Sequence, residues 1–154
     1  MISYCQILSD RPQHRLSEPE VQAILQTILI QLVPLHRQGK AHQNISLQTL
    51  QQQGEQTILL PPEHPNISAY PTQDIYDLGL VALELLTGQV PSPRRIDLTW
   101  DWNHHCLISH QLNAILEHMV TPNPDQRWQN ASQVLSAMGL VVPTPPPPLK
   151  PSQW

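Results

Sequence analysis

The chain of 154 residues contains no phenylalanine, and charged residues make up only 13% of it. The net charge of −4 and the pI near 6.0 give no broad electrostatic attraction for nucleic acid or for an anionic membrane surface. No stretch approaches about 18 uninterrupted apolar residues, so we predict no membrane span. The first residues lack the basic segment and the long apolar run of a signal peptide.

Only two cysteines occur, Cys5 and Cys106. They lie far apart in the sequence, and free thiols in a reducing cytosol are the simpler interpretation. We therefore predict a cytoplasmic protein.

Hydrophobic residues make up 40% of the chain, enough for the core of one domain with a tail. The chain contains nineteen glutamines and few charged residues, and this composition predicts a polar but weakly charged surface. Six of the seventeen prolines fall between Pro143 and Pro151, where we expect an extended polyproline stretch. We divide the chain into an N-terminal segment (residues 1–16), a helical domain (17–140) and a Pro-rich tail or linker (141–154).

The clearest predicted helix begins at Ser17, because Ser17-Glu18-Pro19-Glu20 has the pattern of a capping box. Pro34 should kink its last turns, and Gly39 should end it. Its apolar residues recur at helical spacing: Val21, Ile24, Leu25, Ile28, Leu29, Leu32 and Val33.

A second predicted helix, residues 74–87, is apolar on nearly every face, which places it at the centre of the domain. Ser109 and Asn130 can each cap a further helix. Residues 57–60 are typical of a short strand, whereas we interpret the run Gln51-Gln52-Gln53 as a solvated loop.

Four sequence motifs follow one another in an order that resembles the Ser/Thr protein kinase family. Residues 41–50 (AHQNISLQTL) resemble the catalytic loop H-R-D-x-K-x-x-N. Pro62-Glu63 and residues 74–79 (DIYDLG) resemble the A-P-E and D-x-Y-S-x-G motifs, and residues 123–127 (NPDQR) are similar to D-P-x-x-R. The resemblance runs from about Leu16 to Met138. It implies a mainly α fold, a kinase-like C-terminal lobe with minor β structure and no N-terminal lobe.

The positions that would carry out phosphoryl transfer depart from the family pattern. The catalytic aspartate aligns with Asn44, whose neutral amide cannot act as a general base. The loop lysine aligns with Ser46, the metal-binding asparagine with Thr49, and the arginine of H-R-D with Gln43. A chain without phenylalanine cannot contain a D-F-G motif, and its five glycines form no phosphate-covering loop. We therefore predict no catalytic residues, no cofactor and no enzyme activity.

Other motif residues match positions that maintain the fold of the family. The resemblance implies an ion pair between Glu63 and Arg127, which would be costly to break from one side. It also implies that Asp74 accepts backbone N–H groups of the catalytic loop and that His42 packs beneath that loop.

A histidine-rich segment offers an alternative from another functional class. His104, His105, Cys106 and the nearby His110 could bind a metal ion or serve an enzyme of another class. Adjacent histidine side chains often diverge, however, and the segment lacks the two-pair spacing of a structural zinc site. We interpret it as a loop, and elemental analysis would decide.

The leading hypothesis is a non-catalytic scaffold or regulatory module derived from a kinase C-terminal lobe. We expect a protein partner or self-association through the face left open by the missing N-terminal lobe. The Pro-rich tail is interpreted as a spacer, with docking on an SH3-like groove as the alternative. The chain could also regulate a domain that follows the tail.

Overall fold

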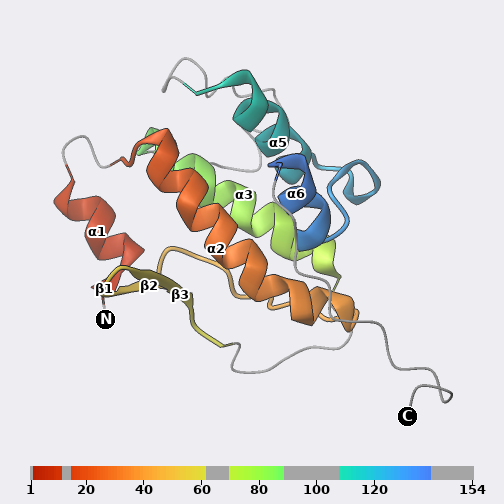
Figure 1. The fold of residues 1–154 in the computed structure, drawn as a ribbon, viewed down its shortest axis with the longest axis horizontal. Coiled ribbons are helices and arrows are strands. Elements are labelled where there is room, and N and C mark those ends of the chain that lie inside the picture. Colours follow the sequence, from red (N-terminus) through yellow and green to blue (C-terminus); the bar gives the residue numbers. More distant parts are fainter. Residues whose placement is uncertain (1, 12–14, 62–69, 89–107, 140–154) are drawn as a thin grey trace, which may run out of the picture.

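Two long helices lie side by side at the centre of the fold, with short helices and a small sheet around them (Figure 1). The computed structural model describes residues 2–11, 15–61, 70–88 and 108–139. The predicted fold class, mainly α with minor β, is confirmed. The elements in chain order are β1 (Ile2–Ser3), α1 (Tyr4–Asp10), α2 (Glu18–Arg37), β2 (Leu50–Gln53), β3 (Gln56–Leu59), α3 (Pro71–Thr87), α5 (His110–Val120), the 3-10 helix η3 (Pro124–Gln126) and α6 (Ala131–Ala137).

Helix α2 begins where the capping box predicts. The amide of Glu20 donates to the Ser17 hydroxyl oxygen at 3.4 Å. The Glu20 carboxylate accepts from that hydroxyl at 3.1 Å and from the guanidinium of Arg11, whose Nη2 lies 2.9 Å from Oε2. The seven apolar residues of the predicted stripe are all buried, and the helix contains Pro34 in its last turns.

Most of helix α3 is buried, as its continuous apolar pattern predicts, and only Tyr76, Asp77, Leu80 and Glu84 between Asp74 and Thr87 are half-buried. From Asp74 to Gly88 no residue is fully exposed, and α2 and α5 both pack against the helix. A Cβ atom added at Gly79 would lie 2.7 Å from Cγ1 of Val120 and 2.9 Å from Cβ of Met119. Glycine at this position therefore lets α3 and α5 approach closely.

Helices α5 and α6 begin at the predicted capping residues. Ser109 Oγ accepts from the amide of Leu112 at 3.2 Å, and Asn130 Oδ1 accepts from the amide of Gln133 at 3.0 Å. These bonds satisfy helix N–H groups that otherwise have no partner within the helix.

The sheet is antiparallel, with strand order β1-β2-β3. The interpretation of Gln51-Gln52-Gln53 as a solvated loop is wrong, because these residues form most of β2 and pair with β3. Gly54, at φ +61°, lies in the hairpin turn. The turn lets β2 pair with β3, and this pairing forms a strand although the residues of β2 are mostly polar.

The side chain of Gln31 on α2 closes the free edge of β3: Nε2 donates to the carbonyl of Thr57 at 3.0 Å, and Oε1 accepts from the amide of Leu59 at 3.1 Å.

The N-terminal segment contains a helix that the sequence analysis did not predict. Helix α1 is capped by Ser3 and buries Tyr4 and Leu8 in the main core. The Tyr4 hydroxyl lies 2.7 Å from the Thr57 hydroxyl of β3. With only two buried side chains, α1 has too short an apolar stripe to be recognised by periodicity, and it packs as part of the helical domain.

Candidate functional site

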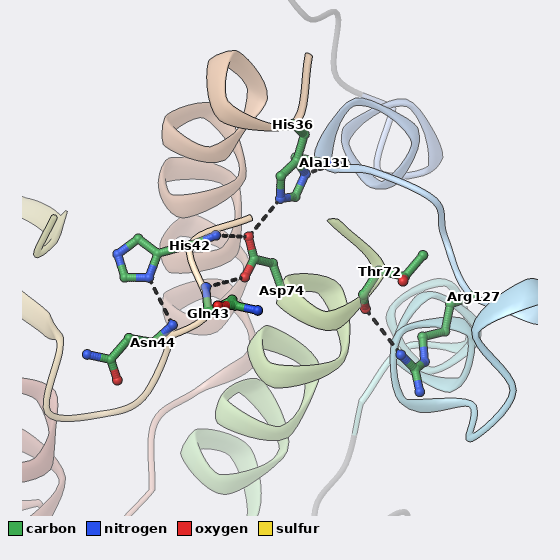
Figure 2. A network of polar contacts seen from close by, with 8 residues as sticks. All are labelled: His36, His42, Gln43, Asn44, Thr72, Asp74, Arg127 and Ala131. Atoms are coloured by element: carbon green, nitrogen blue, oxygen red, sulfur yellow. Dashed lines mark hydrogen bonds and ion pairs between the residues drawn. The ribbon is translucent and has the colours of Figure 1, made fainter. Parts of the chain in front are cut away.

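A buried carboxylate joins three parts of the fold at the end of α2 (Figure 2). Asp74 is 0% exposed and accepts three hydrogen bonds. The amide of His42 donates to Oδ2 at 2.6 Å, the amide of Gln43 donates to Oδ1 at 2.8 Å, and Nε2 of His36 lies 2.9 Å from Oδ2. We call this set of residues, together with Ala131, the Asp74 junction.

The hydrogen bonds of His36 define its tautomer. The amide of Ala131 donates to Nδ1 of His36 at 3.0 Å, so this nitrogen carries no proton. The proton therefore resides on Nε2, which donates to Asp74. A single neutral ring thus connects the first residue of α6 to the buried carboxylate of α3.

The backbone that follows, residues 42–49, is the segment that resembles a catalytic loop, and we call it the relic loop. His42 is buried; its Nδ1 accepts from the amide of Asn44 at 3.1 Å, and its Nε2 lies 2.6 Å from the carbonyl of Leu60. Gln43 adopts φ +69°, a left-handed conformation that is uncommon for a non-glycine residue. The two backbone bonds to Asp74 flank this position and hold it.

The side chains at the positions that align with the family's catalytic residues either face solvent or close the loop. Asn44 is exposed, and its amide points away from Asp74 (Figure 2). The Thr49 hydroxyl lies 2.7 Å from the carbonyl of Asn44 and accepts from the amide of Ser46 at 2.9 Å. The Ser46 hydroxyl accepts from the amides of Gln48 and Thr49, each at 3.3 Å. Both hydroxyls are thus engaged with the loop itself.

The residues directly after β3 also lack the groups needed to hold a metal ion. Leu60 and Pro61 follow the strand, and neither side chain carries an oxygen. Among the residues that the structure describes, no group of three or more His, Cys, Asp or Glu side chains could hold a metal ion. Of the predicted metal candidates, His104, His105 and Cys106 lie outside the described residues, and His110 is the exposed first residue of α5.

Two carboxylates on α3 face a small hollow next to the relic loop. Asp77 and Glu84 line this hollow of about 190 Å³ together with Ser46. Burial raises the pKa of Asp77 to about 6; the hydrogen bond from Gln73 opposes this rise, and the nearby charge of Asp74 adds to it. Burial also raises the pKa of Glu84. The hollow therefore stabilises the neutral forms of both acids.

Arg127 forms a second anchor, between α3 and the segment before α6. Its Nε, Nη1 and Nη2 donate to the carbonyls of Thr121 (2.7 Å), Thr72 (3.3 Å) and Pro122 (3.0 Å). Its guanidinium carbon lies 4.5 Å from the centre of the Tyr76 ring. Glu63, the predicted ion-pair partner, lies outside the described residues, so the pair stays a prediction.

Sequence reasoning missed His36, which is as central to the site as Asp74. The signal was present: His36 continues the helical spacing of Leu32 and Val33, so it had to be buried with them. A buried imidazole needs hydrogen-bond partners on both nitrogens, and such a residue therefore predicts a polar junction.

The architecture is that of part of a protein kinase domain. The PknI kinase domain of Mycobacterium tuberculosis aligns with 90% of this chain at a TM-score of 0.70 and 20% identity, and the chain spans 60% of it. A mutant form of the same domain aligns at 22% identity with the same TM-score and coverage. The predicted likeness to a kinase C-terminal lobe is confirmed at the level of the fold.

The sequence comparisons find Ser/Thr protein kinases of cyanobacteria. Serine/threonine-protein kinase B of Synechocystis is 31% identical over 85 residues, which are 52% of this chain and 14% of the relative. Serine/threonine-protein kinase PknA of Nostoc is 32% identical over 81 residues, 49% of this chain and 14% of the relative. The chain therefore spans about a seventh of the length of these curated relatives. No family model matches the chain. Within its described residues, no helix combines the length and apolar composition needed to cross a membrane.

Proposed function

We propose that this chain is a non-catalytic protein-binding or regulatory module that uses a kinase-like helical lobe as its scaffold, in the cytoplasm. The relic loop is the observation that carries the proposal. Its backbone is held by Asp74 in a defined conformation, while Asn44, Ser46 and Thr49 supply neither a base, nor a cation, nor a suitable metal ligand.

Phosphoryl transfer requires a base, a cation and metal ligands at defined positions. Loss of a general base alone removes a factor of roughly 10²–10⁴ from the rate. The Ser46 and Thr49 hydroxyls close the loop instead of pointing at a ligand. The relatives are named as Ser/Thr protein kinases, but this chain aligns with only a small part of them. Phosphoryl transfer by this chain is therefore not part of the proposal.

The binding surface is the face formed by α1, the β2–β3 hairpin and the relic loop, which an N-terminal lobe would cover in a complete kinase domain. The bond between Tyr4 and Thr57 and the backbone bond from Cys5 to Leu47, 3.2 Å long, fix α1 to the rest of this face. Gln52 and the 53% exposed Ile2, which are paired across β1 and β2 and share one side of the sheet, present carboxamide and apolar groups without charge. Such a face suits a protein partner better than a nucleic acid.

The first test is a thermal-shift titration with Mg·ATP. We expect no rise in the melting temperature, because a ligand stabilises a protein only by binding its folded state. The matched variant is Asn44→Asp, which restores the carboxylate and should still show no ATP-dependent shift and no phosphate transfer. Tight ATP binding, or phosphate turnover that disappears in Asn44→Ala, would refute the proposal.

The second test is affinity purification from the native cell with wild type and two glutamine variants. Gln52→Arg changes the proposed face, and the control Gln129→Arg makes the same change at an exposed position before α6. A specific partner should be retained by wild type and Gln129→Arg and lost with Gln52→Arg. Equal recovery by all three proteins would place the binding elsewhere.

A further inference from the structure

The outer face of α2, opposite the core, carries a narrow uncharged stripe. Ala23, Thr27, Ile30 and Pro34 follow one another at spacings of four, three and four residues, which align them along one side of a helix. Ile30 is 46% exposed, and Ala23 and Pro34 are exposed as well. We call these four residues the α2 seam. The buried residues of α2 lie on the opposite side of the helix, so the seam faces away from the core.

Thr27 on the seam and Gln31 beside it already have hydrogen-bond partners within the protein. The Thr27 hydroxyl donates to the carbonyl of Ala23 at 2.9 Å. The Gln31 amide is bound at both of its atoms by β3. Pro34 has no N–H group. Covering the seam would therefore leave few polar groups without hydrogen bonds, and the desolvation penalty of a contact would be small.

The charges of α2 lie only at its two ends, and they have opposite signs. Glu18 and Glu20 are in the first turn and Arg37 is in the last, while His36 is buried and neutral; no Asp, Glu, Lys or Arg lies between Glu20 and Arg37. Two such helices packed in parallel would bring like charges together. Packed antiparallel, they bring opposite charges together and oppose their dipoles.

We propose that the α2 seam binds the α2 seam of a second copy of this chain, in an antiparallel, two-fold symmetric contact. When the two-fold axis passes midway between Ile28 and Leu29, Thr27 faces Ile30 of the second copy and Ala23 faces its Pro34. The same register places Glu20, which already binds Arg11, next to Arg37 of the second copy. The seam is thus complementary to itself in size, polarity and charge.

The size of the seam determines the strength of the contact. Residues 23–34 span about 18 Å of helix, and one helix face buries less than the roughly 800 Å² per partner of a standard stable interface. The dimer is therefore weak and depends on concentration. It uses a different face from the one in the proposed function, so either proposal can fail without the other.

Sedimentation velocity of the full chain over about a hundred-fold range of concentration tests the contact. We expect wild type to shift from monomer towards dimer. Ile30→Asp places like charges next to each other across the axis and should stay monomeric throughout. The control Gln22→Asp makes an equivalent charge change at an exposed position of α2 outside the seam and should dimerise like wild type. Circular dichroism melts check that each variant is folded.

A charge exchange tests the register itself. Thr27→Lys alone should be monomeric, because the added cations approach each other across the axis. Mixing Thr27→Lys with Ile30→Asp should restore dimers, because the register brings the lysine of one chain to the aspartate of the other. Wild type that remains monomeric at every concentration, or equal dimerisation of Ile30→Asp and Gln22→Asp, would overturn the proposal. Failure of the mixture to dimerise, when wild type does, would overturn the antiparallel register.

Discussion

The Asp74 junction and the relic loop are adjacent and share His42 and Gln43, yet they relate to the kinase pattern in opposite ways. In the junction, His42 and Asp74 match the family, are buried and form several hydrogen bonds each. In the rest of the loop, the positions that align with catalytic residues of the family hold Asn44, Ser46 and Thr49, which are exposed or half-buried. A buried polar network constrains its members through stability, whereas a surface side chain without a chemical role does not. The segment therefore matches the kinase pattern where its residues are buried in the junction and departs from it where they are not.

The largest effect should come from Asp74→Asn, which keeps the shape of the side chain but replaces one accepting oxygen with an NH₂ group. That group would face an N–H donor, and the junction would lose at least one bond to a buried backbone amide. We expect a loss of about 3–5 kcal/mol in the free energy of unfolding, measured by urea denaturation. The exposed Asp125→Asn is the control and should change stability by less than about 0.5 kcal/mol. Similar losses in the free energy of unfolding for Asp74→Asn and Asp125→Asn would show that the buried Asp74 junction contributes no more to stability than an exposed carboxylate.

A smaller effect is expected for Arg127→Ala, which removes three bonds to backbone carbonyls and the contact with Tyr76. We expect a loss of about 1–3 kcal/mol, seen as a fall of several degrees in the melting temperature. Arg127→Lys keeps the charge without the planar guanidinium, and its melting temperature should lie between those of wild type and Arg127→Ala. An unchanged melting curve for Arg127→Ala would show that this anchor is dispensable.

The ion pair predicted between Arg127 and Glu63 can be measured in the same series. A double-mutant cycle with Glu63→Gln and Arg127→Ala isolates their interaction energy. A coupling energy near zero would show that Arg127 acts through its carbonyl contacts alone.

Within the relic loop, Thr49→Val should destabilise the protein, because the Thr49 hydroxyl closes the loop. The valine keeps the shape but cannot accept from the Ser46 amide or donate to the Asn44 carbonyl. We expect a loss of about 1–2 kcal/mol by urea denaturation. Thr49→Ser, which keeps the hydroxyl, should lose less. Equal stability of Thr49→Val and wild type would mean that the hydroxyl does not close the loop.

The smallest effect concerns pH and Asp77. Burial raises the pKa of Asp77 from its ordinary value of 3.8 to about 6, so the folded state holds this proton more tightly than the unfolded state. The associated stability is present below about pH 4 and is lost as the pH rises through about 6. Asp77→Asn should therefore stabilise the protein relative to wild type at about pH 8 and not at about pH 4. The gain should be less than about 1 kcal/mol, since the side chain is only half-buried. A stability difference between Asp77→Asn and wild type that is the same at both pH values would contradict this.

The sequence predicted those parts of the fold that depend on local signals. Capping serines and asparagine, a long apolar stripe and an all-round apolar helix each have a physical cause within a few residues, and α2, α3, α5 and α6 begin close to the expected positions. The motif order placed Asp74 and His42 in the same neighbourhood. Periodicity alone could not have done so, because they are 32 residues apart.

What the sequence could not supply depends on contacts between distant segments. Helix α1 is short, and it is held by the bond from Tyr4 to Thr57, 53 residues away. The glutamine run forms a strand because β1 and β3 flank it. The role of His36 depends on Asp74 of α3 and Ala131 of α6, which lie 38 and 95 residues away in the sequence.

The two hydrogen bonds between the Gln31 side chain and β3 affect how other protein chains can bind to the edge of the sheet. A bare strand edge is a template on which foreign strands assemble, and glutamine-rich strands are prone to such assembly. The Gln31 carboxamide of α2 binds the carbonyl of Thr57 and the amide of Leu59 on that edge, so these two groups are not available to pair with a further strand. The β3 edge of the glutamine-rich hairpin is thereby less open to a further strand, and recognition along this edge has to proceed through side chains.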